Sequence, residues 1–194
     1  MKITFIRPNM IKERQSDAME PLAFSILDGL TPEGIDVQLF DERIEEINFD
    51  EKTDLAAFSV ETFTAKRAYE ISSIYRKKRV PVIMGGFHPS FMPDEILDNA
   101  DSVVIGDAEE VWQQIILDVK NGNLAKRYKK DIQSIDGINF PRKLFAHKKY
   151  SKMIPIQYSR GCKFSCDFCS INAFYDNRLL QRPIQEVIDE IERT

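Results

Sequence analysis

The sequence predicts an α/β protein with a doubly wound parallel sheet of five strands, and two observations support this fold class. Short apolar runs alternate with helical patterns over the first 121 residues. The chain has 194 residues and is 43% hydrophobic, which is enough apolar material for a sizeable core. Strands that alternate with helices form parallel sheets that are covered on both faces, with right-handed crossovers.

The expected elements follow one another in a regular order. An apolar strand at 2–7 opens the chain, and a long polar loop leads to a helix at 21–30. The remaining strands are expected as short apolar runs at 36–40, 55–60, 81–84 and 102–105. The remaining helices of this region are expected at 65–78, 93–99 and 109–121.

The loops after these strands form a first candidate binding site, because ligands of such sheets bind outside the carboxyl ends of the strands. Paired glycines let a ligand approach the backbone closely, and hydroxyl groups can bond its polar atoms. As an alternative, the glycines only reverse the chain, while the hydroxyls cap helices and the histidine packs locally. The candidate residues are Asn9, Ser59, Glu61, Thr62, Gly85, Gly86, His88, Gly106 and Glu109.

Two common nucleotide signatures are missing from the sequence. No G-x-G-x-x-G follows the first strand, and no G-x-x-x-x-G-K-[ST] occurs anywhere in the chain. The sequence therefore gives no support for NAD or ATP as the ligand of these loops.

The net charge of −4 hides a strong asymmetry. Residues 121–163 contain 11 Lys and Arg against only Asp131 and Asp136, so the rest of the chain is strongly acidic. A basic stretch can bind nucleic acid, but this one contains aromatic and apolar packing residues and lacks dense arginine. We expect it to be a linker that wraps over an acidic domain. No apolar run approaches the roughly 20 residues of a membrane span and no signal peptide opens the chain, so we expect a cytoplasmic protein.

All cysteines lie in one short window with the spacing C-x3-C-x2-C, namely Cys162, Cys166 and Cys169. Such thiolates suit an iron–sulfur cluster, and because these clusters normally have four cysteine ligands, one iron would stay open for a substrate. A zinc site is a weaker alternative, since neither His88 nor His147 has a suitable spacing from the window. Inert buried thiols are a further alternative, while a disulfide framework conflicts with the odd cysteine number.

The cysteine window resembles the cluster loop of the radical S-adenosylmethionine (SAM) superfamily. The resemblance rests on the spacing, on the preceding Ser159–Gly161 and on the aromatic Phe168 before the last cysteine. It implies that the three cysteines ligate a [4Fe-4S] cluster, that SAM binds the fourth iron, and that the backbone at Phe168 lies near the adenine. The segment 182–191 resembles the first barrel helix of that family, although its apolar periodicity by itself indicates only a helix.

A complete barrel needs roughly 200 residues or more, whereas the chain ends at Thr194. We therefore expect the chain to hold only the truncated beginning of a radical SAM partial TIM barrel. We expect it to be the N-terminal part of a longer enzyme, and to be inactive by itself.

The runs at 82–90, 93–95 and 103–110 resemble the Rossmann-like cobalamin-binding domain that precedes the barrel in one large group of radical SAM enzymes. The resemblance implies that the candidate residues of the strand loops contact cobalamin. One departure is the absence of D-x-H-x-x-G after the first strand, so cobalt has no histidine ligand there. The radical SAM enzymes of this group commonly bind cobalamin without that histidine. The expected parts are a cobalamin-binding-like domain at 1–122, the basic linker at 123–152 and the start of the radical SAM domain at 153–194.

The resemblance implies an enzyme that reductively cleaves SAM to a 5′-deoxyadenosyl radical, with methyl transfer or a radical rearrangement as the outcome. It also implies an electron donor such as flavodoxin or ferredoxin. The sequence does not identify the substrate, which could be a small molecule, a peptide or a lipid. The alternative function is a Rossmann-like module that binds a substrate or partner without cobalamin. A receiver-like signalling domain is disfavoured, because no acidic pair follows the first strand.

Overall fold

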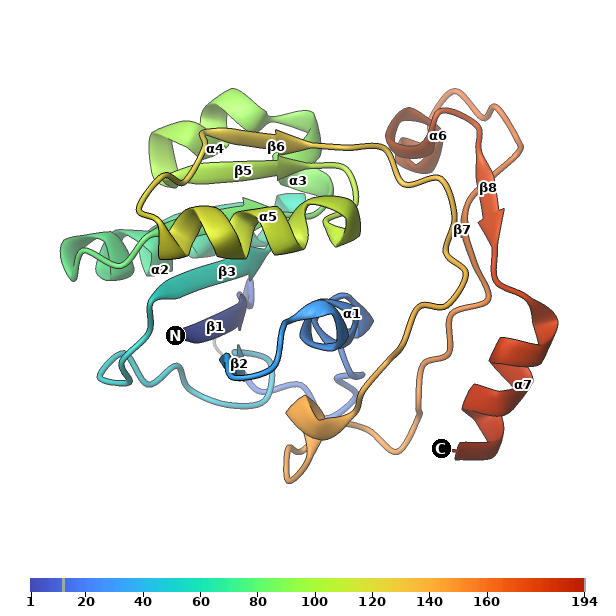
Figure 1. Ribbon diagram of the computed structural model, residues 1–194, viewed down its shortest axis with the longest axis horizontal. Coiled ribbons are helices and arrows are strands. Elements are labelled where there is room, and N and C mark those ends of the chain that lie inside the picture. The colour runs from blue at the N-terminus through green and yellow to red at the C-terminus, as the bar shows by residue number, and fades with distance from the viewer. Residues whose placement is uncertain (12, 194) are drawn as a thin grey trace.

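The computed structural model describes residues 1–11 and 13–193 and contains a six-stranded parallel sheet (Figure 1). The strand order is β2-β1-β3-β4-β5-β6, and every neighbouring pair is parallel. The strands are β1 (Lys2–Arg7), β2 (Asp36–Asp41), β3 (Leu55–Ser59), β4 (Val82–Gly85), β5 (Ser102–Ile105) and β6 (Arg127–Lys129). The predicted doubly wound fold is confirmed, and each of the five predicted strands is present in the sheet.

The strand number of five was wrong, because β6 adds a sixth strand at the edge of the sheet. Its sequence is Arg-Tyr-Lys, in which only Tyr128 is buried. Charged residues on a short edge strand are common, since they discourage pairing with other chains. Such a strand carries too little apolar pattern to be predicted, and it lies within the segment expected to be a linker.

Helices cover both faces of the sheet, and each face has its own apolar core. The first core lies under α1 and α5 and includes Phe5, Phe24 and Trp112, while the second lies under α2 and α4 and includes Ile71 and Met84. The helices are α1 (Leu22–Leu30), α2 (Ala65–Lys77), α3 (Phe87–Phe91), α4 (Pro93–Asn99) and α5 (Glu109–Lys120), with a 3-10 turn η1 (Thr62–Thr64) before α2. Among α1 to α5, only the short α3 was not predicted.

The segment after β6 runs back along the acidic part of the molecule, with one 3-10 turn, η2 (Lys143–Phe145). Ion pairs and hydrogen bonds attach it there. The pairs join Arg142 to Glu20, Lys143 to Asp28, and Lys148 to Glu45, and Tyr150 donates a hydrogen bond to Asp41. The described residues contain no helix that is both long and apolar enough to cross a membrane.

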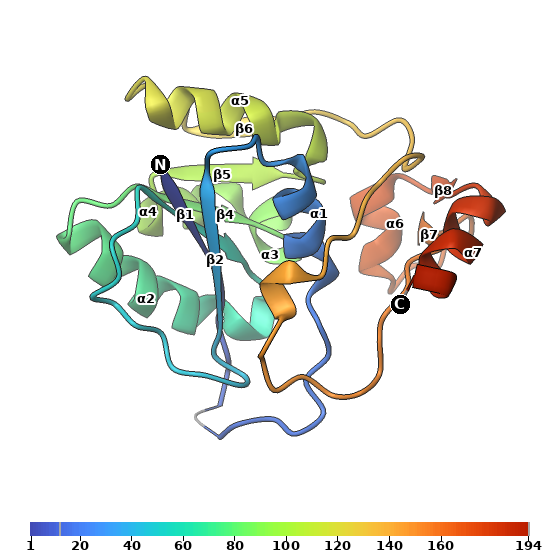
Figure 2. The same ribbon diagram turned by 60° about the horizontal axis from the view of Figure 1, so that its bottom comes forward.

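The C-terminal part begins with the hairpin of β7 (Ser159–Gly161) and β8 (Leu179–Gln181), which are antiparallel. The cysteine loop and α6 (Ser170–Tyr175) lie between these strands, and α7 (Ile184–Arg193) follows them. The arrowheads of β5 and β6 point toward α6 (Figures 1 and 2). The cysteine-bearing part therefore lies beyond the carboxyl ends of the strands.

Candidate cofactor site at the carboxyl edge of the sheet

The loops after β3, β4 and β5 meet α1, β7 and α6 around a cavity of about 240 Å³, which we call the edge cavity. Its walls come from the sheet domain and from the cysteine-bearing part of the chain. Its lining residues are Leu22, Ala23, Phe24, Ile26, Leu27, Phe58, Ser59, Glu61, Gly85, Gly86, Phe87, Gly106, Asp107, Ala108, Glu109, Gln157, Arg160, Phe174 and Tyr175.

The structure brings together most of the residues predicted for the strand loops. The edge cavity is lined by Ser59, Glu61, Gly85, Gly86, Gly106 and Glu109. Asn9 lines a second cavity of about 280 Å³, which Ser59 and Glu61 also line. Among the residues that the structure describes, neither Thr62 nor His88 lines either of these two cavities. Thr62 is an exposed residue of η1.

His88 has a local structural role in the fold. Its ring is buried, and Nε2 lies 3.0 Å from the hydroxyl of Tyr69. The same hydroxyl donates a 2.8 Å hydrogen bond to Glu95 of α4. This is the local packing that the sequence left open as the alternative for His88, and a contact of His88 with cobalamin stays a prediction.

Two glycines at the edge, Gly86 and Gly106, differ in whether the fold leaves room for a side chain. Gly86 has φ +112°, and a Cβ atom there would lie 2.8 Å from the carbonyl oxygen of Val60, so the fold itself requires glycine. Gly106 has φ +85°, but the described residues leave open space where its Cβ would lie. Ser90 holds these two loops together, because its hydroxyl donates to the Gly86 carbonyl at 2.7 Å and accepts from the Gly106 N–H at 2.9 Å.

The second cavity contains charges of both signs. Burial lowers the pKa of Arg7, and the nearby Arg43 lowers it further. Burial raises the pKa of Glu61, while the Arg7 charge opposes that shift. Asn9 is fixed at the same edge, since its amide donates to the Glu13 carbonyl and accepts from Gln15. The end of β1 thus offers a cation and amide groups where cobalamin domains with the D-x-H-x-x-G motif carry a histidine.

The three cysteines lie in the loop between β7 and α6, and all are free thiols. Cys166 is exposed and the other two are partly buried. In residues 1–11 and 13–193, no three metal-ligating side chains are gathered closely enough to hold a metal ion. The donor set itself fits an iron–sulfur cluster, since cysteine thiolates are the usual ligands of such clusters. Binding a cluster would have to draw the thiolates together.

Phe168, whose backbone was predicted to lie near the adenine of SAM, has a side chain that is 92% exposed. Phe164 in the same loop is also exposed. The structure therefore places an uncovered aromatic surface beside the cysteines.

The sequence did not predict that residues of β7 and α6 close one side of the edge cavity. Arg160 of β7 forms ion pairs with Asp107 and Glu109, and Tyr175 of α6 donates a hydrogen bond to Asp107. Burial raises the pKa of Asp107, although the Arg160 charge opposes this. Burial lowers the pKa of Arg160, but the two carboxylates raise it more, so the net shift is upward. The acidic run after β5 and the arginine beside the cysteine window were the available signals, but only the tertiary structure pairs them.

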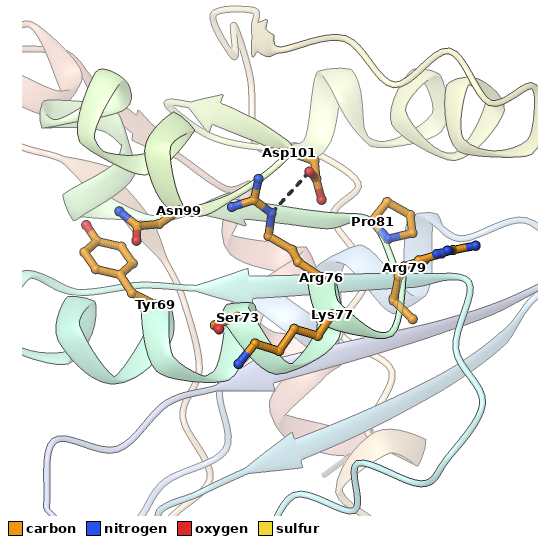
Figure 3. A pocket seen from close by; sticks show the side chains of 9 residues that line it. Tyr69, Ser73, Arg76, Lys77, Arg79, Pro81, Asn99 and Asp101 are labelled. Carbon is orange, nitrogen blue, oxygen red and sulfur yellow. Dashed lines mark ion pairs between the residues drawn. The ribbon is translucent and has the colours of Figure 1, made fainter.

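A larger hollow of about 790 Å³ lies at the opposite edge of the sheet, around the end of α2 (Figure 3). Arg76 and Asp101 form a 3.4 Å ion pair there. Pro81 and Asp101 immediately precede β4 and β5, so this hollow lies at the amino ends of the strands. Parallel sheets bind ligands at the other edge, and the hollow is remote from the cysteine loop.

The edge cavity fits part of a cobalamin molecule. Its volume is below the roughly 300–1,000 Å³ of ordinary small-molecule sites, so the macrocycle would have to lie outside it. The open space at Gly106 and the ordinary 3.5 Å contact that a Cβ at Gly85 would make leave the backbone accessible there. The residues present are therefore compatible with the group, with the glycine loops as its floor.

The comparisons with known proteins agree with this geometry. The model of the B12 binding domain family matches residues 17–116. The chain is 35% identical over 181 residues to bacteriochlorophyllide d C-8(2)-methyltransferase of Chlorobaculum tepidum, covering 85% of this chain and 40% of that protein. It is 30% identical over 179 residues to bacteriochlorophyllide d C-12(1)-methyltransferase of the same organism, with coverage of 88% and 39%.

A more distant relative is the hopanoid C-2 methylase of Rhodopseudomonas palustris, which is 25% identical over 185 residues. That alignment covers 90% of this chain and 34% of the relative. The chain thus spans 40% or less of the length of these three relatives. The family model covers more than half of the chain. The chain therefore belongs to the B12-binding domain family, within the group of cobalamin-binding-domain-containing radical SAM enzymes that its sequence resembles.

Proposed function

We propose that the chain is the N-terminal part of a cobalamin-dependent radical SAM methyltransferase. In this proposal, cobalamin binds over the carboxyl edge of the sheet, and a [4Fe-4S] cluster with SAM binds at Cys162, Cys166 and Cys169. The observation that carries the proposal is the edge cavity, because the B12-binding loops and the cysteine-bearing part of the chain line it together. Two cofactors that act on one substrate must lie close to each other.

The methyl-transfer outcome and a substrate class follow from the relatives. Two of them are named as methyltransferases of bacteriochlorophyllide and a third as a methylase of hopanoid. We therefore propose methyl transfer to a carbon atom of a large, mostly apolar multi-ring compound. The exposed aromatic residues Phe164 and Phe168 support an apolar substrate near the cysteines.

The residues of the chain would have distinct tasks. When bound, the cluster supplies the electron for the cleavage of SAM, and cobalamin supplies a carrier for the methyl group. The three thiolates would hold the cluster, and the backbone at Phe168 would lie beside the adenine. Gly85, Gly86 and Gly106 would let the corrin approach the sheet edge, while Ser59 and Glu61 would offer hydrogen bonds to its polar groups. Asn9 would contact the cofactor from the second cavity, and Glu109 would act through its ion pair with Arg160.

Anaerobic reconstitution of the longest native form with iron and sulfide tests this proposal. The expected result is about four irons per chain and formation of 5′-deoxyadenosine from SAM, with product formation dependent on hydroxocobalamin and a reduced flavodoxin or ferredoxin. Replacing each cysteine by alanine should abolish both the visible absorption of the cluster and SAM cleavage. Cleavage that survives these substitutions would refute the cluster assignment.

The same experiment separates the alternative function. SAM cleavage that is unaffected by cobalamin, in a protein that retains no cobalamin, would indicate a substrate- or partner-binding module in place of a cobalamin domain. Zinc in place of iron would indicate a structural metal loop.

A further inference from the structure

The cysteine loop is fixed to the carboxyl edge of the sheet on both of its sides. On the leading side, Arg160 lies two residues before Cys162. On the trailing side, α6 begins directly after Cys169. Both flanks contact the loops and helices that line the edge cavity.

On the leading side, the contact is a buried ion pair. The side chain of Arg160 is 6% exposed, and its Nη1 lies 2.6 Å from Oε1 of Glu109 and 3.3 Å from Oδ1 of Asp107. Its Nε donates a 2.9 Å hydrogen bond to Gln157. Removing one partner of a buried pair leaves an uncompensated charge, so such pairs hold their geometry strongly.

Backbone contacts with the opposite arm of the hairpin hold Gly161 and Cys162, the two residues that follow Arg160. Gly161 has φ +80°, and a Cβ there would lie 2.0 Å from the carbonyl oxygen of Arg178, so the two strands of the hairpin meet closely at this point. The N–H of Cys162 donates a 3.0 Å hydrogen bond to the same carbonyl. A shift of the β7 backbone at Arg160 would therefore move Cys162 as well.

On the trailing side, two aromatic residues of α6 contact the sheet domain. The ring of Phe174 lies 4.5 Å from the ring of Phe87 in α3, measured between centroids. The hydroxyl of Tyr175 donates a 3.3 Å hydrogen bond to Asp107, which also pairs with Arg160. Asp107 is thus the point where the two flanks of the cysteine loop converge.

We propose that Arg160 is a positioning residue, and that its ion pair with Glu109 and Asp107 fixes the distance between the cysteine loop and the cobalamin-binding edge. We call this contact the edge clamp. That the clamp positions a [4Fe-4S] cluster relative to cobalamin rests on the proposed function. The clamp itself joins two parts of the chain that are 51 to 53 residues apart in sequence, so its existence can be tested without any cofactor.

The first test is amide hydrogen exchange on the 194-residue chain. The variant Arg160→Gln should speed exchange in β7 and α6 by at least about tenfold, because it leaves the carboxylates of Asp107 and Glu109 without their cation. Glu109→Gln leaves Arg160 paired with Asp107 and should therefore speed exchange less. Exchange in β1 and β3 should be unchanged. Arg160→Lys should give an intermediate effect. The control is Arg127→Gln, which removes an exposed ion pair with Asp94 that includes no residue of β7 or α6, and it should leave exchange in β7 and α6 unchanged.

The second test uses the longest native form, loaded with both cofactors and examined by electron paramagnetic resonance. The reduced cluster should broaden the cob(II)alamin signal when the two spins are close, and Arg160→Gln should weaken this coupling by at least about twofold while iron and cobalamin contents stay the same. Arg160→Lys should retain most of the coupling. A residue with a purely structural role would change the cofactor contents without changing the coupling per loaded molecule.

The two tests separate the failure of the clamp from the failure of the proposed function. A wild-type protein that retains no cobalamin or no iron would refute the proposed function, and the exchange data would still decide whether the clamp exists. Unchanged exchange in Arg160→Gln would overturn the clamp. Full loading with unchanged spin coupling would overturn its positioning role.

Discussion

At the scale of single residues, Gly86 shows how the fold and the site share their requirements. The sequence singled out Gly86 as a place where a ligand could approach the backbone. The structure gives it a more basic role, because its positive φ and its contact with Val60 exclude any side chain. The sequence can therefore identify a glycine at the site correctly, while the reason that glycine is required there becomes visible only in the folded structure.

Replacement of Gly86 by alanine should destabilise the protein by about 2–4 kcal/mol, since it combines an unfavourable φ with a close backbone contact. The matched control is Gly85→Ala, whose Cβ would meet only Val104 at an ordinary 3.5 Å and should cost less than about 1 kcal/mol. Urea denaturation measures both changes. Equal losses of stability in the two variants would contradict the assigned role of Gly86.

Glu61 gives a prediction about pH. Its pKa is raised in the folded state by burial, against the opposing charge of Arg7. The folded state therefore binds a proton more tightly than the unfolded state, and this stabilisation, present at low pH, is lost as the pH rises through the folded pKa. Glutamine stays neutral throughout. The stability of Glu61→Gln relative to the wild type should thus increase from about pH 4 to about pH 8 in urea denaturation. A relative gain of the wild type over that range would show that the shift has the opposite sign.

At the scale of elements, α1 and α5 share an apolar core and are also joined by one buried hydrogen bond. Trp112 of α5 is 2% exposed, and its indole N–H donates a 2.9 Å hydrogen bond to the hydroxyl of Thr31 at the end of α1. The variant Thr31→Val has nearly the same shape but leaves the indole N–H unpaired, so it should cost about 1–3 kcal/mol. Thr31→Ser keeps the hydroxyl and should cost less than half as much. Denaturation followed by circular dichroism compares the two, and an equal cost would rule out the hydrogen bond as the cause.

The elements that the sequence predicted are those with strong apolar periodicity. The strands β1 to β5 and the helices α1, α2, α4 and α5 lie within one or two residues of their expected bounds. The missed elements are short and weakly patterned. Strand β6 has one buried residue among three, and α3 contains Pro89 in a five-residue turn. Such elements form because neighbouring elements offer hydrogen-bond partners, which a local sequence pattern does not record.

At the scale of the whole molecule, the candidate site could be predicted only in part. The loops at the strand ends followed from the topology, and six of the nine predicted residues line one cavity. The closing wall of Arg160, Phe174 and Tyr175 comes from a segment that begins about 50 residues later than the last strand loop. No rule of spacing places that segment over the sheet. The ion pair with Asp107 and Glu109 does so in the folded molecule.

The whole-molecule arrangement also explains why the larger hollow is not the candidate site. It lies at the amino ends of the strands, where Arg76 and Asp101 neutralise each other. The smaller edge cavity has the glycine loops, the carboxyl ends of the strands and the cysteine-bearing part of the chain on its walls. Position in the fold thus outweighs volume in identifying the site.

A titration of the longest native form with hydroxocobalamin, followed by its visible spectrum, tests the central claim most directly. The wild type should bind about one cobalamin per chain, and Ser59→Phe, which fills the edge cavity, should weaken binding at least about tenfold. Ser73→Phe places the same side chain in the hollow at the opposite edge (Figure 3) and should bind like the wild type. Binding that is insensitive to Ser59→Phe, or that is lost in Ser73→Phe alone, would contradict a cobalamin site at the carboxyl edge of the sheet.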